Sequence, residues 1–163
     1  MRLLLPLLLF TLLPLAAIAG NWSDPAALEF KDGVNVVYHI KVSDTRDDGV
    51  AKGLAELRHL IRIYDEQGIG MENRSVCAVF DADAAPFVLS DPAYSKLGIA
   101  DTNPNAKLIA ELVEAGVNVE VCGQRLKRDG MTKDDVLPGV HVALGGQPRV
   151  IDLQLQGYAY FRF

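Results

Sequence analysis

The chain has 163 residues, with 16 basic and 21 acidic side chains and a net charge of −5 at neutral pH. That length suits one domain with a single core. The acidic balance argues against nucleic acid and anionic membrane surfaces as partners, because both repel a negatively charged protein.

Residues 1–19 have the pattern of a secretory signal peptide. Arg2 supplies the positive charge, residues 3–16 are an apolar stretch with two prolines, and Ala17 and Ala19 are small residues at the positions that a signal peptidase reads. A membrane-spanning helix needs about 20 apolar residues and rarely holds two prolines in so short a span. We therefore predict cleavage near Ala19, a periplasmic or secreted protein, and no membrane contact after cleavage.

Strand and helix patterns alternate along the remaining chain. Residues 20–33 are expected to form an irregular lead-in, and residues 34–163 a single domain. Strands are predicted from β-branched or continuous apolar runs, and helices from apolar residues at three- and four-residue spacing. In chain order the predicted elements are strand 34–40, helix 50–67, strand 76–80, a short helix within 81–98, helix 103–116, strand 117–122, a short helix before Pro138, strand 140–143, helix 145–157 and strand 158–163.

This alternation predicts an α/β fold, a flavodoxin-like three-layer sandwich with a mostly parallel five-stranded sheet and helices on both faces. Asn103 is expected to cap its helix, with Pro104 at the first helical position. In the last helix Val150, Ile151 and Leu155 are expected to face the core.

Polar residues alternate with apolar ones in two predicted strands. In the strand that ends at Cys122, for example, Asn118 and Glu120 alternate with valines. A parallel sheet that is covered on both faces usually has apolar residues on both sides. Two interpretations stay open: one face of the sheet is thinly covered and meets another subunit, or these polar groups reach water near the strand ends.

Cys122 is the most informative residue of the sequence. It ends a predicted parallel strand, and open α/β sheets place their chemistry at the carboxyl ends of their strands. Gly123 follows and permits close approach of backbone or substrate. Arg125, Lys127 and Arg128 come next, and nearby cations favour a thiolate over a thiol.

A disulfide between Cys77 and Cys122 is the first alternative to consider in an exported protein. If the strand order is the flavodoxin-like 2-1-3-4-5, the two cysteine strands flank the first strand and lie about 9–10 Å apart. A disulfide requires Cα atoms within roughly 7 Å. We therefore expect Cys77 to be an inert core residue and Cys122 to be a free thiol.

A free thiolate at Cys122 would be a nucleophile that attacks a sulfane sulfur, a persulfide or a disulfide. Gly123, Gln124 and Arg125 would shape the site for the resulting anion. His39 stands near the end of a strand that we expect beside the Cys122 strand. It would either pair with the thiolate or form a structural hydrogen bond to a carbonyl group, and both interpretations stay open.

The loop after the first strand argues against nucleotide cofactors. Residues 44–49 contain three acids and a single glycine, Gly49, so the loop would repel a phosphate. Metal-ligand spacing is also absent among the cysteines and histidines of the sequence. We expect neither a cofactor nor a metal.

Several ordered motifs lie between about Val34 and Phe163. They are Asn103-Pro104-Asn105, Cys122-Gly123-Gln124, Leu137-Pro138-Gly139-Val140, Ile151-Asp152-Leu153-Gln154-x-Gln156-Gly157-Tyr158, and Ala84-Ala85-x-Phe87-Val88-Leu89-x-Asp91-x-Ala93-Tyr94. Together they resemble the DsrE/DsrF-like family, and more narrowly an exported single-domain branch with a Cys-Gly-Gln motif.

The resemblance implies a flavodoxin-like fold, assembly into homo-oligomers (trimers or hexamers), and a cysteine at the Cys122 position. In the sulfur-relay members of the family that cysteine accepts persulfide sulfur and passes it on. One departure matters. Where the family pattern leads us to expect a His-Gly pair after the second strand, this chain has Asp81-Ala82, so a histidine base from that position is absent.

Two functional hypotheses follow. The first is an exported sulfur-handling protein that binds or relays sulfane sulfur as a persulfide on Cys122, acting as a carrier or transferase toward a donor or acceptor protein. The second is a non-catalytic oligomeric binding module of the same fold with a structural thiol. The first is the leading hypothesis, and the missing His-Gly pair and the oxidising compartment support the second.

Overall fold

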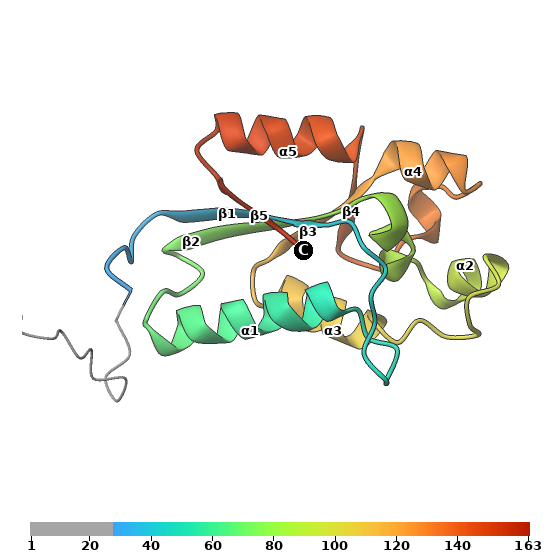
Figure 1. The fold of residues 1–163 in the computed structure, drawn as a ribbon, viewed down its shortest axis with the longest axis horizontal. Helices are drawn as coiled ribbons and strands as arrows, with labels where there is room; N and C mark the ends of the chain where they lie inside the picture. Colours follow the sequence, from blue (N-terminus) through green and yellow to red (C-terminus); the bar gives the residue numbers. More distant parts are fainter. Residues whose placement is uncertain (1–27) are drawn as a thin grey trace, which may run out of the picture.

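The computed structural model describes residues 28–163, so the predicted signal peptide and the first part of the lead-in lie outside the described residues. The described part is a three-layer α/β sandwich around a five-stranded sheet in which every neighbouring pair is parallel (Figure 1). The predicted α/β class, with helices on both faces of a parallel sheet, is confirmed.

The sheet has the spatial order β4-β3-β2-β1-β5. Its register places Val37 opposite Cys77, and Cys77 opposite Asn118 on the next strand. The strands are β1 (Val34–Ile40), β2 (Arg74–Phe80), β3 (Asn118–Cys122), β4 (Val140–Ala143) and β5 (Ala159–Arg162).

The expected flavodoxin order 2-1-3-4-5 was wrong, because β2 lies between β1 and β3. The connections that contain α1 and α3 move the chain one strand at a time in one direction along one face. The connection through α5 then returns the chain across the other face to the edge beyond β1. Crossovers of one hand that reverse direction must change face, and the connections through α1, α3 and α5 follow this rule.

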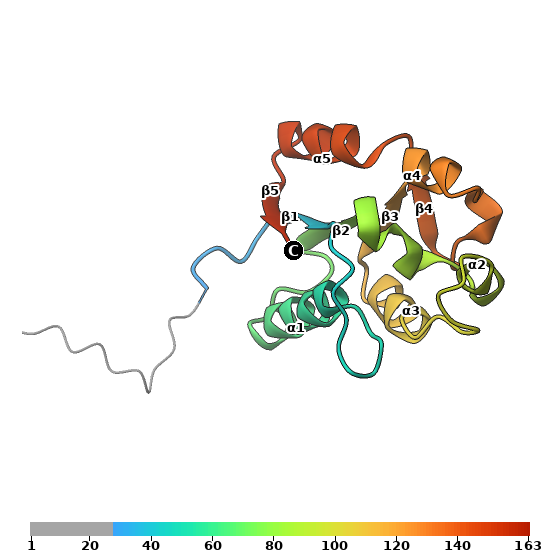
Figure 2. The same ribbon diagram turned by 45° about the vertical axis from the view of Figure 1, so that its right-hand side comes forward.

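Helices cover both faces of the sheet. Figures 1 and 2 show α1 and α3 on one face and α5 on the other, with α4 near the start of α5. The sequence did not predict α4, which begins directly after Cys122. The helices are α1 (Lys52–Glu66), α2 (Asp91–Lys96), α3 (Ala106–Glu114), α4 (Gly123–Arg128) and α5 (Gly146–Leu155), with short 3₁₀ helices η1 (Ala82–Val88) and η2 (Lys133–Asp135).

The larger part of the core lies between the sheet and helices α1 and α3. Leu54 and Leu57 of α1 and Ile109 of α3 are completely buried there, together with Phe80 of β2. Burial of one such side chain stabilises the fold by about 1.5–3 kcal/mol. This face therefore supplies most of the hydrophobic stabilisation.

The smaller cluster lies under α5, where Val150 and Leu153 pack on Val37, Cys77 and Val79. The prediction of which α5 residues face the core was only partly right. Val150 is buried, whereas the side chains of two other predicted core residues are exposed, Ile151 by 57% and Leu155 by 84%.

Of two predicted helix N-termini, one is confirmed and the other was wrong. The Thr132 and Asp135 side chains form a reciprocal capping box at η2, as their spacing predicted. Helix α3, however, begins at Ala106, three residues after Asn103. The Asn103 amide instead donates to the carbonyl groups of Phe87 and Leu89, at 2.8 and 2.7 Å, and so fixes the preceding loop.

Candidate functional site

The carboxyl ends of β2 and β3 form the point at which the chain changes face. After β2 it continues to the α3 side of the sheet, and after β3 it enters α4, near α5 (Figure 1). Open α/β sheets bind ligands in the crevice outside such a switch point. A pocket of about 380 Å³ lies here, lined by Lys41 after β1, Asp81 and Ala82 after β2, Cys122 at the end of β3, and residues 145–148 at the start of α5.

Cys122 occupies the predicted position at the end of a parallel strand, where it is 6% exposed. Gly123 begins α4 immediately afterwards. A Cβ atom on Gly123 would lie 2.7 Å from the carbonyl oxygen of Ala143, so a glycine is needed for the close packing of α4 on the end of β4. This packing, rather than an approaching substrate, explains the Cys-Gly pair.

Gln124, Arg125 and Arg128 of α4 also line the pocket. Arg125 is already occupied: its Nε donates to Asp129 at 2.6 Å, and its guanidinium donates to the Ala82 carbonyl at 2.7 Å and to Asp83 at 3.1 Å. Burial alone would lower the pKa of Arg125, but the bonds with Asp129 and Asp83 outweigh it and raise that pKa. Arg125 therefore links α4 to η1 by hydrogen bonds.

Most of the uncompensated positive charge in the pocket comes from Lys41 and Arg128. Arg128 is 68% exposed and only reaches Asp129 at 4.0 Å, the outer limit of an ion pair. Of the three cations that follow Cys122 in sequence, Lys127 is not part of the lining. The segment directly after Cys122 is helix α4, which the sequence did not predict, so the helical turn rather than the order in the sequence decides where these cations lie.

His39 does not lie on a strand next to that of Cys122, because β2 separates β1 from β3. The expected adjacency was wrong. The His39 ring is 4% exposed, with Nδ1 3.2 Å from the Tyr160 hydroxyl and Nε2 3.6 Å from Oδ2 of Asp81. Burial lowers the pKa of His39, although the Asp81 carboxylate opposes this shift. His39 therefore contacts Asp81, which lines the pocket, but is not itself part of the lining.

Ala82 has a φ angle of 49°, and it is the one non-glycine residue of the described chain with positive φ. This left-handed conformation disfavours a residue with a Cβ atom. It occurs where the family pattern leads us to expect glycine. The preceding carboxylate of Asp81 accepts the Ala82 N–H at 2.7 Å.

Sequence reasoning recognised Asp81 and Ala82 as a departure but not as pocket residues. The available signal was the position of Asp81 directly after the buried run 76–80, at a strand end.

Both cysteines are free, as predicted, but for a different geometric reason. Their strands are neighbours. Cys77 pairs with Asn118, four residues before Cys122, and four residues of a strand span about 13 Å. Burial and the nearby Glu120 raise the pKa of Cys77 to about 12, so this thiol stays protonated. Cys77 belongs to the core, and Cys122 to the pocket.

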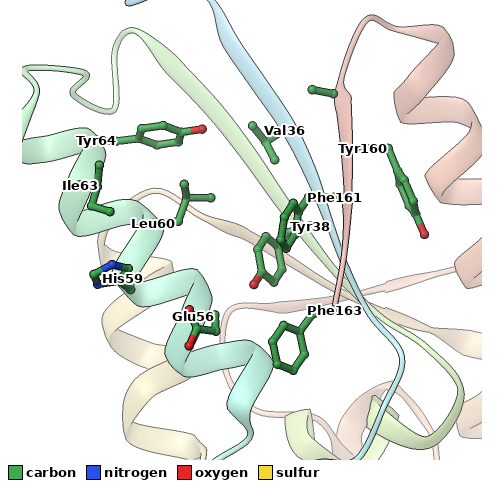
Figure 3. A pocket seen from close by; sticks show the side chains of 11 residues that line it. Val36, Tyr38, Glu56, His59, Leu60, Ile63, Tyr64, Tyr160, Phe161 and Phe163 are labelled. Atoms are coloured by element: carbon green, nitrogen blue, oxygen red, sulfur yellow. The ribbon is translucent and has the colours of Figure 1, made fainter. Parts of the chain in front are cut away.

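A second pocket, of about 480 Å³, lies between α1 and the β5 edge. Its lining is aromatic: the rings of Tyr38 and Phe161 stack with centroids 5.0 Å apart. Figure 3 shows Phe161 and Phe163 facing α1, whereas Tyr160 points to the other side of β5. No cysteine lines this pocket, so the Cys122 pocket is the better candidate for chemistry.

Residues 28–163 contain neither a candidate metal centre nor a candidate membrane-spanning helix. No group of three histidine, cysteine or acidic side chains is placed to hold a metal ion in this part of the chain. None of its helices combines the length and the apolar character that a membrane crossing requires.

The sequence profile of the DsrE/DsrF-like family matches residues 55–163, about two thirds of the chain, including β2, β3 and the lining of the Cys122 pocket apart from Lys41. The chain belongs to the DsrE/DsrF-like family. The resemblance seen in the motifs is thereby confirmed at the family level.

Solved structures agree with this DsrE/DsrF-like assignment. A protein of unknown function, MTH1491 from Methanobacterium thermoautotrophicum, is similar with a TM-score of 0.58 and 23% identity, over 80% of this chain and 99% of that chain. The ychN protein from E. coli is similar with a TM-score of 0.57 and 14% identity, over the same shares. At these identities the likeness shows the fold alone. A search of curated proteins finds no match.

Proposed function

We propose that this DsrE/DsrF-like protein binds sulfane sulfur as a persulfide on Cys122 and relays it to a partner protein. The observation that carries the proposal is the position of Cys122, at the end of β3 and at the switch point, in a polar pocket with two weakly compensated cations. Membership of the family and the strand-end thiol support the same chemistry. The N-terminal pattern supports export and removal of residues 1–19.

The proposed step is a thiol exchange. The Cys122 thiolate attacks the outer sulfur of a donor persulfide, a new S–S bond forms, the donor S–S bond breaks, and the donor leaves as a thiolate. No external oxidant is consumed. Cys122 then carries a persulfide anion, for which Lys41, Arg128 and the Gln124 amide are the available partners in the lining. Gly123 keeps α4 close enough to place them.

A second candidate, a non-catalytic oligomeric binding module, is favoured by one specific observation. Asp81 and Ala82 replace the expected His-Gly pair, so a carboxylate rather than an imidazole lies beside the thiol. A thiolate forms less readily next to a carboxylate.

We also propose a homo-oligomer, a trimer or hexamer, for either function. Exposed apolar side chains support it: Leu144 after β4 is 89% exposed, and Ile151 and Leu155 project from the outer face of α5. Large apolar side chains gathered on a surface commonly mark a protein interface.

The test is intact mass spectrometry of the exported chain before and after incubation with a sulfane-sulfur donor, followed by peptide mapping. We expect addition of one sulfur atom to Cys122, reversed by reductant, and its loss in Cys122→Ser with unchanged folding. The buried Cys77→Ser variant is the matched control and should still load. The same masses report whether residues 1–19 have been removed.

Sulfur on the Cys122→Ser variant, or no loading of the reduced wild-type chain by any donor, would contradict the sulfur relay and leave the binding module as the better interpretation.

A further inference from the structure

A chain of polar contacts crosses three strands and ends in the Cys122 pocket. The Tyr160 hydroxyl on β5 lies 3.2 Å from Nδ1 of His39 on β1, and His39 Nε2 lies 3.6 Å from the Asp81 carboxylate that follows β2. The order β2-β1-β5 makes these strands neighbours. Of the three residues, Asp81 alone lines the pocket, so any influence of the other two reaches Cys122 through Asp81.

His39 Nε2 has no hydrogen-bond partner, and it is the one such buried side-chain nitrogen or oxygen in residues 28–163. At 3.6 Å the approach to Asp81 is too long for a regular hydrogen bond. If the Tyr160 hydroxyl donates to Nδ1, Nε2 carries the ring hydrogen and directs it at the carboxylate. The unpartnered side of the buried His39 ring therefore faces the Asp81 carboxylate.

The carboxylate of Asp81 is held from two further sides. Its Oδ1 accepts the Ala82 N–H at 2.7 Å. A Cβ atom on Gly146 would lie 2.6 Å from Asp81 Cγ, so α5 begins directly against this side chain. The amino end of a helix stabilises a negative charge. These contacts hold a carboxylate that is only 13% exposed in the lining of the Cys122 pocket.

The charges in the pocket are few. Arg125 is engaged by Asp129 and Asp83, which leaves Lys41 and Arg128 as the main free cations and Asp81 as the carboxylate of the lining. A single carboxylate therefore offsets about half of the free positive charge near Cys122. Its removal would change the potential at the sulfur more than the loss of a distant acid.

We propose that Asp81 sets the charge selectivity of the Cys122 pocket, disfavouring negatively charged reaction partners and dianions most of all. His39 and Tyr160 are positioning residues that hold the carboxylate. For sulfur donors this selects persulfides, with one charge at the reacting end, over the dianion thiosulfate. The donor choice rests on the proposed function, whereas the charge selectivity does not.

The selectivity depends on pH through His39. Its ring faces Asp81 of β2, Tyr160 and Arg162 of β5, and Lys41 of its own strand, while α5 contributes apolar Val150 and Leu153 to this face. Of these residue types only histidine has an ordinary pKa near neutrality, and burial lowers the pKa of His39. When His39 gains a proton, its charge offsets Asp81, so anions reach Cys122 more easily at the lower pH.

The experiment measures alkylation of Cys122 in the full mature chain by iodoacetate and by neutral iodoacetamide, with peptide mass spectrometry. The ratio of the two rates cancels the thiolate fraction and reports the local potential. We expect Asp81→Asn to raise the iodoacetate-to-iodoacetamide ratio by about threefold or more, the effect of one unit charge several ångströms away in a wet pocket. His39→Gln should remove the rise of the wild-type ratio at low pH.

Asp101→Asn, which removes an exposed carboxylate that is not part of the pocket lining, is the charge-matched control and should leave the ratio unchanged. An equal ratio in the wild type and Asp81→Asn overturns the proposal. So does a pH-dependent ratio that survives His39→Gln. Failure of iodoacetamide to label Cys122 also overturns it, because the pocket would then not lead to the thiol.

A parallel arm compares thiosulfate with a small-molecule persulfide as donor. With thiosulfate the thiolate takes the sulfane sulfur and sulfite leaves, so atoms and charge balance. Asp81→Asn should increase loading from thiosulfate more than loading from the persulfide. If the alkylation ratios shift as expected but no variant loads sulfur from either donor, charge selectivity stands and the sulfur-relay function fails.

Discussion

Ala82 keeps a left-handed backbone with an alanine side chain. Its φ of 49° follows directly from the end of β2, where the chain must turn into η1 while Asp81 accepts the Ala82 N–H. For an alanine this conformation costs about 1–2 kcal/mol. The surrounding contacts, including the hydrogen bond from Arg125 to the Ala82 carbonyl at 2.7 Å, offset that cost.

At this residue we predict that Ala82→Gly raises the free energy of unfolding by about 0.5–1 kcal/mol, because relief of the strain exceeds the added freedom of glycine in the unfolded chain. Urea denaturation followed by circular dichroism measures it. Ala84→Gly, two residues along at a buried position with ordinary φ, is the control and should be destabilising. A destabilised Ala82→Gly variant would mean that the turn is not strained.

Helix α5 is tied to the sheet by a charged group as well as by its apolar face. Glu120 of β3 is 5% exposed and receives two hydrogen bonds from Arg149, at 2.7 and 2.8 Å, and one from Asn118 at 2.6 Å. Burial alone would raise the pKa of Glu120, but the bonds from Arg149 and its charge lower it below the ordinary value. Because α5 begins at the pocket, this pair also fixes residues 145–148.

For this element we predict that Arg149→Met destabilises the protein by roughly 2–4 kcal/mol, because a buried carboxylate loses its partner while the 29% exposure of Arg149 moderates the loss. Thermal or urea unfolding measures the change. Glu120→Gln combined with Arg149→Met should recover most of it. A double variant as unstable as the single one would show that the arginine acts through packing alone.

The same pair gives a pH dependence with a definite sign. A lowered pKa in the folded state means that Glu120 contributes stability above its unfolded pKa, and that this contribution is lost as the pH falls through the folded value. Without Arg149, burial raises the pKa instead. The stability difference between wild type and Arg149→Met should therefore shrink as the pH falls. The decrease begins above the ordinary glutamate pKa, where the variant's carboxyl gains its proton, and continues below that pKa, where the wild-type carboxyl gains its own.

On the scale of the whole molecule, the two faces of the sheet are unequally covered. Helices α1 and α3 bury one face, while α5 alone spans the other and leaves Leu144, Ile151 and Leu155 in solvent. The uneven cover agrees with the first of the two interpretations of the polar alternation, a thinly covered face. The buried Glu120 and Asn118 contacts show that part of this alternation forms an internal network instead.

For the assembly we predict that sedimentation velocity of the mature chain detects an oligomer and that Leu155→Glu, a charge on an 84% exposed apolar position, shifts it toward monomer. Ile99→Glu, at an exposed apolar position outside α5, is the control and should leave the assembly intact. A monomeric wild type at all concentrations, or equal behaviour of both variants, would place the interface elsewhere or exclude it.

Local sequence patterns alone determined the α/β class, the approximate bounds of the strands, the capping box at Thr132, and the place of Cys122 at a strand end. These features depend on residues that are near one another in the chain: side-chain periodicity, capping spacing and glycine stops. Family motifs with fixed spacing carried the same local information, and the family match confirmed the family that they indicated.

The tertiary structure alone decided the strand order, and with it which residues meet. Whether β1 or β2 lies next to β3 depends on the direction of each crossover connection and on the face of the sheet that it covers. No local pattern encodes either of these. The order placed Asp81 between His39 and Cys122, and it replaced the expected imidazole–thiol pair with a carboxylate held by an imidazole. The inward face of α5 was settled in the same way, because Arg149 pairs with Glu120 across 29 residues of sequence and Val150 and Leu153 pack on the sheet.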